Sequence, residues 1–374
     1  MSKHVLVTGG AGFIGSFIVD ELLRRGHRVR ILDNLEPQVH KVFGGVPPYL
    51  NKKAELLVGD VRDRNTIKDA LNDVDIVFHE AGMVGVGQSQ YQIQRYLDAN
   101  VMGTAQLLDV LANEKHAVKK ILVAGSISEY GEGSCACPEC GIVNPPLRPE
   151  EQLKRKDWEL HCPECNSTLA PVGTKEDKLL DVNSIYAISK QAQEQMVLNI
   201  GKTYGIPAVS LRYWNTYGPR QSLGNPYTGV CAIFMSRLKN NQPPVIFEDG
   251  KQRRDFVSVH DIVQANMLAM ESEAANGQIF NVGSGQNYSI LEIAQTLAKM
   301  YGRAISPQVT GDFRKGDVRH CFADISKIRQ KLGFKPGVTL EAGLNELKEW
   351  VDGAPAIDTF AQATSEMKLR NIVV

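Results

Sequence analysis

Two sets of side chains between residues 126 and 190 have the types and the spacing that chemistry requires. The first set contains Ser126, at the end of an apolar run, together with Tyr186 and Lys190 in a Tyr-x-x-x-Lys pattern. Residues four apart lie on one face of a helix, so the phenol and the amine would be neighbours. A nearby ammonium stabilises a phenolate, which suits a general base, and the Ser126 hydroxyl could hydrogen-bond the same reacting oxygen. The pattern predicts a proton-transfer site.

The second set consists of four cysteines that lie between these residues, in two Cys-Pro-Glu-Cys pairs. They are Cys137, Cys140, Cys162 and Cys165. Their spacing is close to that of a zinc ribbon, and four thiolates complete a tetrahedral Zn²⁺ site without an open position. We therefore expect a structural zinc ion. Cys135 and His161 are spare candidate ligands, and an iron–sulfur cluster or metal-free reduced cysteines are the alternatives.

The composition limits the partners of the chain. Its 374 residues include 42 Lys plus Arg and 42 Asp plus Glu, so no net field favours nucleic acid or an anionic membrane. No apolar run approaches the ~20 residues of a membrane span, and the chain starts with a strand-like segment and not with a signal peptide. We expect a soluble cytoplasmic protein that binds neither nucleic acid nor membrane. In that reducing compartment, clustered cysteines indicate metal ligands before disulfides.

A glycine-rich turn near the N-terminus predicts a dinucleotide site. Gly9, Gly12 and Gly15 follow a short apolar run and precede a segment with helical periodicity, and Phe13 and Ile14 lie within the turn. Glycines let the backbone approach a pyrophosphate, and the helix N-terminus supplies free N–H groups. An ordinary glycine-rich turn is the alternative, but the strand–turn–helix context favours the nucleotide site.

Polar residues at the ends of the next strands refine this prediction. Asp33 ends the second strand and precedes Asn34; a carboxylate there accepts both ribose hydroxyls and would repel a 2′-phosphate, so NAD is favoured over NADP. Asp60, before Val61, ends the third strand and is a candidate for the adenine edge or for the N-cap of the following helix. His79, in the fourth strand, is interpreted as a core histidine.

Alternating strands and helices predict an α/β fold with a Rossmann-type, doubly wound parallel sheet. Later the alternation loosens, which indicates a smaller C-terminal substrate-binding region with crossings back into the sheet. We expect an NAD-binding domain at 1–133 and 173–215, an inserted zinc-ribbon-like module at 134–172, a mainly substrate-binding region at 216–352 and a tail at 353–374. The tail has no apolar periodicity before its last residues, so we expect it to be partly disordered or packed on a neighbouring subunit.

In this order, the glycine turn, Asp33, Ser126 and the Tyr-x-x-x-Lys pattern resemble the extended short-chain dehydrogenase/reductase family. The resemblance is closest to its nucleotide-sugar epimerase/dehydratase branch and extends over nearly the whole chain. Further markers are His79-x-Ala81-Gly82, Asn100-Val101-x-Gly103-Thr104, Arg212-Tyr213-x-Asn215-x-Tyr217-Gly218-Pro219, Arg254-Asp255-Phe256-Val257 and Arg314-Lys315-Gly316-Asp317. The resemblance implies bound NAD, a nucleotide-diphosphate sugar as substrate and a homodimer paired through helices that flank the catalytic tyrosine.

The resemblance also assigns residues to the site. Cofactor contacts are implied for Gly9, Gly12, Phe13, Ile14, Gly15, Asp33, Asn34, Asp60, Val61, Ala81, Gly82, Asn100, Tyr186 and Lys190. Substrate contacts are implied for Ser126, Ser128, Asn215, Arg254, Arg314, Asp317 and Cys321. The two arginines would hold the diphosphate bidentately, because planar guanidinium groups match its oxygens. Asp317 could contact a ribose or pair with Arg314.

Departures from the branch patterns narrow the expected reaction to NAD-dependent inversion at C4 of the sugar, an isomerase activity. Sugar 4,6-dehydratases carry Asp-Glu after the Ser/Thr, whereas this chain has Ile127 and Ser128, with Glu129 one residue out of register. UDP-galactose 4-epimerases carry a lysine where this chain has Val84, and Cys321 occupies the position of a residue that gates their sugar pocket.

The insertion of cysteine pairs makes the chain look most like the dTDP-L-rhamnose 4-epimerases, which form dTDP-6-deoxy-L-talose. Three alternatives stay open. The first is 4-epimerisation of UDP-glucose, a UDP-N-acetylhexosamine or a UDP-uronate, and the second is reduction or dehydration of a nucleotide sugar. The third is a non-catalytic NAD-binding regulator, which the intact Ser126, Tyr186 and Lys190 disfavour.

Overall fold

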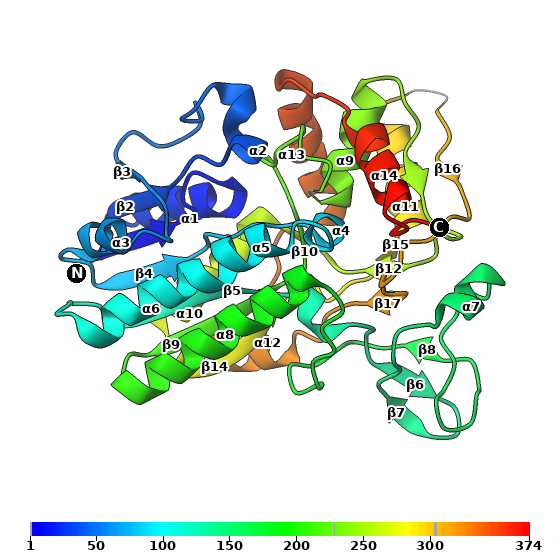
Figure 1. Cartoon of the computed structure of the whole chain (residues 1–374), viewed down its shortest axis with the longest axis horizontal. Coiled ribbons are helices and arrows are strands. Elements are labelled where there is room, and N and C mark those ends of the chain that lie inside the picture. The colour runs from blue at the N-terminus through cyan, green and yellow to red at the C-terminus, as the bar shows by residue number, and fades with distance from the viewer. Residues whose placement is uncertain (1, 228, 303–304) are drawn as a thin grey trace.

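The computed structural model describes residues 2–227, 229–302 and 305–374, and its centre is a seven-stranded parallel sheet (Figure 1). The strand order is β14-β9-β5-β4-β1-β2-β3. These strands are β1 (His4–Thr8), β2 (Arg28–Asp33), β3 (Glu55–Val58), β4 (Ile76–His79), β5 (Lys120–Ser126), β9 (Ala208–Tyr213) and β14 (Gln278–Val282). The order reverses between β1 and β4, and ligands bind outside the carboxyl ends of the strands at such a point.

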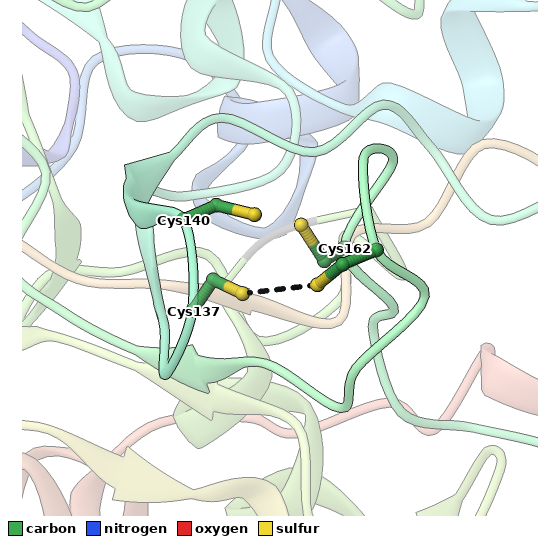
Figure 2. A group of neighbouring side chains, drawn as sticks. Cys137, Cys140 and Cys162 are labelled. Carbon is green, nitrogen blue, oxygen red and sulfur yellow. Dashed lines mark hydrogen bonds between the residues drawn. The ribbon is translucent and has the colours of Figure 1, made fainter.

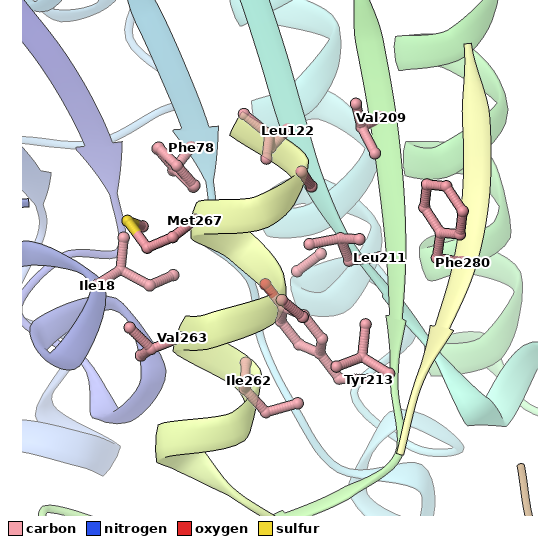
Figure 3. Packing of buried hydrophobic residues seen from close by; sticks show 14 of the residues in the cluster. Ile18, Phe78, Leu122, Val209, Leu211, Tyr213, Ile262, Val263, Met267 and Phe280 are labelled. Atoms are coloured by element: carbon pink, nitrogen blue, oxygen red, sulfur yellow. The ribbon is translucent and has the colours of Figure 1, made fainter. Parts of the chain in front are cut away.

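Helices cover both faces of the sheet. One face carries α1 (Phe13–Arg24), α10 (Val259–Glu271) and α12 (Ser326–Leu332), and the other carries α3 (Arg64–Leu71), α6 (Gly103–Asn113) and α8 (Ile185–Tyr204). Figure 3 shows Ile262 and Met267 of α10 packed against Phe78 and Leu211 of the strands. Strands buried on both faces need the continuous apolar runs seen in this sequence. The predicted Rossmann-type α/β fold is confirmed.

Short elements connect these layers. They are α2 (Pro37–His40), η1 (Lys41–Phe43), α4 (Val86–Ser89), α5 (Ile93–Tyr96), the π-helical η2 (Leu97–Met102), η3 (Ile127–Tyr130) and η4 (Glu273–Ala275). Among the described residues, none of the helices combines the length and the apolar character of a membrane span.

A smaller region, formed mainly by residues after β9, has a core of its own. It contains α9 (Val230–Lys239), α11 (Ile290–Met300), α13 (Leu340–Gly353), β10 (Asn215–Tyr217), β11 (Val245–Ile246), β12 (Arg253–Arg254), β13 (Phe256–Ser258), β15 (Tyr288–Ser289), β16 (Gln308–Val309) and β17 (His320–Cys321). The chain crosses back into the large sheet through β14. Pairing of β10 with β13, and of β12 with β17, brings Asn215 and Arg254 to the edge of the sheet.

Residues 134–172, called the cysteine insertion below, form a separate small body at the lower right of Figure 1. It contains β6 (Cys135–Cys137), β7 (Gly141–Val143), β8 (Ala170–Pro171) and α7 (Glu150–Lys154), with an antiparallel sheet in the order β7-β6-β8. Its core consists of Cys135, Cys137, Leu160, Cys162 and Leu169. The chain on either side pairs with one segment, since Gly133 N donates to His320 O (2.8 Å) and Thr174 N to Phe322 O (2.8 Å).

The C-terminal tail is folded, which differs from the expectation of partial disorder, while packing on a neighbouring subunit stays a prediction. It contains α14 (Phe360–Leu369), and the last residues then pair with the segment around Arg314. Phe313 N donates to Val374 O (2.9 Å), and Lys315 N donates to Ile372 O (2.9 Å). Within α14 the buried residues are Ala363 and Met367, which explains why the sequence shows little apolar periodicity before its last three residues.

Candidate active site

The carboxyl ends of the large sheet face a cavity of about 680 Å³ that is closed on the other side by the smaller region. Most of the residues predicted to bind cofactor or substrate line it. They are Gly9, Gly12, Phe13, Ile14, Gly15, Asp33, Asn34, Asp60, Val61, Ala81, Gly82, Ser126, Ser128, Tyr186, Lys190, Asn215, Arg254, Arg314 and Asp317. Neither Asn100 nor Cys321 is among the described residues that line this cavity. The residues predicted to bind the dinucleotide and the residues predicted to transfer protons therefore line the same cavity.

The glycine turn has no room for side chains. Gly9 adopts φ +70°, and a Cβ there would lie 2.8 Å from Ala81 N. A Cβ on Gly15 would overlap the Gly9 carbonyl oxygen. Gly12 is the N-cap of α1 and offers no side-chain acceptor, so the first N–H groups of the helix are available to a ligand. This arrangement fits a dinucleotide pyrophosphate.

Asp33 joins the glycine turn to the end of β2. Its Oδ2 accepts a hydrogen bond from Ala11 N (3.0 Å), and its Oδ1 accepts one from Leu35 N (2.8 Å). Nearby, the Arg62 guanidinium donates to both oxygens of Asp60 (2.8 and 2.7 Å) and holds the pKa of that carboxyl at about 2. Arg62 is therefore engaged and does not offer a free cation to a 2′-phosphate.

Asp60 was predicted either to contact the adenine edge or to cap the following helix, and the structure excludes the second role. The N-cap of α3 is Asp63, whose carboxylate accepts from Thr66 N (2.7 Å), so the N-cap interpretation of Asp60 was wrong. Asp60 accepts from Asn34 Nδ2 (3.0 Å) and lies in the cavity wall. The two predicted adenosine-side residues therefore act as a hydrogen-bonded pair.

Ser126 ends β5 and caps the 3₁₀ helix η3. Its Oγ accepts from Ser128 N (3.2 Å) and from Ser128 Oγ (2.8 Å). Its backbone N donates to Glu129 Oε1 (2.7 Å). Glu129 is thus a buried helix-capping carboxylate, and it is not among the described residues of the cavity wall. The two hydroxyls, by contrast, face the cavity.

Tyr186 and Lys190 lie in the first two turns of α8. The N-cap Ser184 accepts from Ala187 N (3.1 Å), and Tyr186 N donates to Ser89 Oγ (3.1 Å), which fixes the start of the helix. Lys190 Nζ donates to Gln193 Oε1 (2.8 Å). These contacts direct the phenol and the amine into the cavity.

Burial dominates the protonation of both groups. It raises the pKa of Tyr186 to about 12, and a hydrogen bond with Ser126 opposes this shift. Burial also lowers the pKa of Lys190, while the carboxyls of Glu129, Glu80 and Glu194 act in the opposite direction. We expected the Lys190 ammonium to lower the pKa of the Tyr186 phenol, but it is not among the groups that shift this pKa. A cation brought next to the phenol would stabilise the phenolate.

The candidate diphosphate residues come from three segments. Arg254 donates to the carbonyls of Val318 (2.6 Å) and Arg319 (3.0 Å). Arg314 pairs with Asp317 Oδ2 (2.8 Å), which is the second of the two roles considered for Asp317. Asn215 Oδ1 is buried in the cavity wall without a hydrogen-bond partner. A buried acceptor of this kind needs a donor, and a bound ligand would supply one.

Two predicted contact residues lie behind the wall. The Asn100 side chain bonds to Met83 N (2.7 Å), Met83 O (3.1 Å) and Ser189 Oγ (2.8 Å), so it ties the Ala81–Met83 wall to α8. Cys321 is 1% exposed and packs beside Thr174 and Gly133. A residue in that place can shape the pocket only through its neighbours.

Some cavity residues escaped the sequence analysis. Glu80 occupies the variable position of the His79-x-Ala81 marker; it accepts from Tyr213 Oη (2.9 Å), and burial raises its pKa to about 7. Phe360 and Met367 of α14 also line the cavity, and the non-periodic tail gave no signal for them. His79 is a core residue as predicted, since it bonds to Thr8 and Thr104 (2.8 Å each).

Comparisons with known proteins agree with this geometry. The profile of the NAD dependent epimerase/dehydratase family matches residues 5–152, and that of GDP-mannose 4,6 dehydratase matches residues 167–347. The stretch between the two matches lies inside the cysteine insertion. A dTDP-L-rhamnose 4-epimerase of Burkholderia thailandensis is 38% identical over 352 residues, which cover 93% of this chain and 95% of that protein. The chain belongs to the NAD-dependent epimerase/dehydratase family.

Solved structures of family members have the same fold. UDP-glucose 4-epimerase of Thermotoga maritima, solved with UDP-glucose, is 30% identical, with a TM-score of 0.75 over 93% of this chain and 98% of that one. UDP-glucuronic acid 4-epimerase of Bacillus cereus, solved with UDP-glucuronic acid and NAD, is 26% identical, with a TM-score of 0.74 over 93% and 99%. The predicted family is confirmed.

The glycine turn provides a direct test of cofactor binding in this family member. Gly15→Ala places a methyl group on the Gly9 carbonyl, so we expect purified protein to lose most of its bound NAD, about tenfold or more. Gly224→Ala is the matched control, because a Cβ there meets no atom within 4 Å. Bound nucleotide is measured by chromatography after denaturation. Full NAD occupancy in Gly15→Ala would contradict the assignment of the turn.

Proposed function

We propose that the chain is an NAD-dependent nucleotide-sugar 4-epimerase and that dTDP-L-rhamnose is its substrate, converted to dTDP-6-deoxy-L-talose. One observation carries the activity: Ser126, Tyr186 and Lys190 line the same cavity as the glycine turn and the two arginines. The reaction inverts C4 through a 4-keto sugar. The cofactor is proposed to be NAD, because Asp33 occupies the ribose position and Arg62 is paired with Asp60.

The proton chemistry is assigned to residues of the chain. NAD, when bound, would take up the C4 hydride and return it to the other face of the sugar. Tyr186 Oη accepts the proton of the C4 hydroxyl and later gives it back. Ser126 Oγ, held by Ser128, hydrogen-bonds the same oxygen as its charge changes. The Lys190 ammonium contributes positive charge in the same cavity and orients the sugar and the cofactor ribose by hydrogen bonds.

The positions after Ser126 disfavour dehydration, although part of the chain matches a dehydratase profile. Removal of water needs an acid and a base beside the sugar, and Ile127 and Ser128 supply neither. Glu129 caps η3 with its carboxylate and is bonded to Ser126 N (2.7 Å). For C4 inversion, the only acid–base step that the side chains have to supply is the proton transfer at the C4 oxygen.

The choice of sugar rests on a relative. The 38% identical protein from Burkholderia thailandensis is a dTDP-L-rhamnose 4-epimerase, and its similarity extends over nearly the whole chain. Val84, in the cavity wall, replaces a lysine expected in UDP-galactose 4-epimerases, which also favours another sugar. Epimerisation of UDP-glucose, UDP-N-acetylhexosamines or UDP-uronates is the second candidate, because solved relatives are named as 4-epimerases of UDP-glucose, UDP-N-acetylglucosamine and UDP-glucuronic acid.

The four paired cysteines are proposed to hold a structural zinc ion. Their Sγ atoms all lie within 4.8 Å of one another, and Figure 2 shows the thiols of Cys137, Cys140 and Cys162 converging. A tetrahedral Zn–S₄ site has Sγ–Sγ distances of about 3.8 Å, so the cluster fits it. The spare candidates point elsewhere: Cys135 Sγ donates to Gly133 O (3.7 Å), and His161 Nε2 bonds to Asp157 (3.0 Å).

A homodimer is also proposed, through the helices that flank Tyr186. Apolar side chains on this side of the molecule are exposed, namely Ile93 of α5, Met102 of η2 and Ile188 of α8. Burial of such side chains against a second copy would remove apolar surface from water.

A substrate screen tests the activity. Purified protein with its own NAD should invert C4 of dTDP-L-rhamnose without added reductant, as followed by proton NMR. UDP-glucose, UDP-N-acetylglucosamine and UDP-glucuronic acid are screened in parallel to test the second candidate. Consumption of NAD(P)H, or formation of a 4-keto-6-deoxy sugar from UDP-glucose, would show a reductase or a dehydratase and contradict the proposal.

Tyr186→Phe tests the proton acceptor. Loss of the phenol oxygen should lower kcat by about 10²–10⁴-fold, because general acid–base catalysis contributes this much. NAD content should not change. Tyr204→Phe, at the exposed end of the same helix, is the control. Wild-type turnover by Tyr186→Phe would remove Tyr186 from the reaction.

Metal analysis tests the cysteine cluster. Dialysed protein should contain about one zinc per chain by inductively coupled plasma mass spectrometry. Cys162→Ser should lower this content, whereas Cys231→Ser should keep it, because Cys231 lies in α9 outside the cluster. An iron chromophore, or metal-free wild-type protein, would contradict the zinc assignment.

A further inference from the structure

The cysteine insertion contacts the segment 313–320, which carries the candidate diphosphate residue Arg314. Arg148 is buried, and its Nη2 donates to the backbone carbonyl of Asp317 (3.2 Å). The same guanidinium donates to both oxygens of the buried Glu248 (2.9 Å each) and to Trp158 O (3.0 Å). Arg148 thus holds the middle of the segment from the side opposite the cavity.

Glu159, also in the insertion, holds the end of the segment. Its Oε1 accepts from Arg319 Nη2 (2.6 Å), and its Oε2 bonds to His320 Nε2 (3.1 Å). His320 Nδ1 accepts from Arg253 N (3.2 Å), so one imidazole connects Glu159 to β12, which carries Arg254. The His320 and Arg319 contacts lower the pKa of Glu159 to about 2, which keeps it ionised at neutral pH.

On the cavity side, the same segment orients the two candidate diphosphate arginines, Arg254 and Arg314. Arg254 donates to Val318 O (2.6 Å) and Arg319 O (3.0 Å), and Arg314 belongs to the segment itself. Arg319 is completely buried and also pairs with Asp249 (2.6 Å). Movement of residues 317–320 would therefore displace both guanidinium groups.

The insertion contacts are close to the cysteine cluster. Leu160 and Cys162 belong to the small core of the insertion, one and three residues beyond Glu159. Trp158, on the other side of Glu159, packs edge-on against Phe313 (6.4 Å between ring centroids). Because this core has few apolar side chains, its fold depends on the cross-link that a bound metal would supply.

We propose that the metal-bound cysteine insertion positions the diphosphate site: Arg148 and Glu159 fix the segment 313–320, and the metal keeps these two side chains in place. The identity of the ligand rests on the proposed function. The coupling between the cysteine insertion and the two arginines does not. The insertion is thus a positioning element for substrate affinity, and it leaves the proton transfer and the NAD site unchanged. Neither Arg148 nor Glu159 is among the described residues that line the cavity.

Glu159→Gln in the full-length protein tests this coupling. It replaces the charge-assisted bonds to Arg319 and His320 with weaker ones, so we expect about tenfold weaker binding of dTDP or UDP by calorimetry. KM for the sugar should rise by a similar factor, with kcat within about twofold and with NAD and zinc contents unchanged. Arg148→Met should have the same effect. Glu151→Gln, an exposed charge change on α7, is the matched control.

Zinc removal from the wild-type protein by a chelator should reproduce the weaker nucleotide binding, with NAD retained. Zinc-free Glu159→Gln should bind no more weakly than either alone, because both changes act through one contact. Unchanged nucleotide affinity in Glu159→Gln and Arg148→Met, wild-type affinity after zinc removal, or joint loss of NAD and nucleotide binding would each overturn the proposal. Calorimetry with dTDP and UDP measures nucleotide affinity directly, so it tests the effect of the insertion even if the protein converts none of the screened sugars.

Discussion

A buried ion-pair cluster beneath the cavity fixes the candidate catalytic side chains relative to each other. Arg212 of β9 donates to both oxygens of Glu194 in α8 (3.0 and 2.6 Å), and its Nε lies 3.7 Å from Glu129 Oε2 in η3. Glu194 is one helical turn beyond Lys190, and Glu129 is bonded to Ser126. One guanidinium therefore joins the helix that carries Tyr186 to the strand that carries Ser126.

The electrostatics of this cluster bear on the reaction. Two carboxyls share one arginine in a buried space, and burial, together with the Glu194 carboxyl, raises the pKa of Glu129 well above its usual value. A buried ion pair is costly to break because it leaves a charge without a partner. The cluster thus gives the active site a rigid base, and the ligand cavity can be open without loss of alignment.

Local patterns made part of the site predictable. The glycine turn, Asp33 and the Tyr-x-x-x-Lys pair are each contained in a few consecutive residues, so their positions at the cavity follow from strand, turn and helix geometry. Asn100 and Cys321 match family markers too, but whether a side chain faces a cavity depends on packing from distant segments. The contacts of Arg148 join residues from four separate stretches, and α14 reaches the cavity without apolar periodicity. Such contacts between distant segments cannot be predicted from the spacing of residues along the sequence.

The pairing of the last residues with the Arg314 segment determines where the molecule can be modified. A purification tag added after Val374 would start beside the segment that carries the candidate diphosphate residue Arg314, next to a helix that lines the cavity. The first strand, in contrast, enters the sheet from its amino edge, away from the carboxyl ends that form the cavity. A tag or a surface linker therefore belongs at the N-terminus, where it leaves the entrance for the sugar nucleotide free.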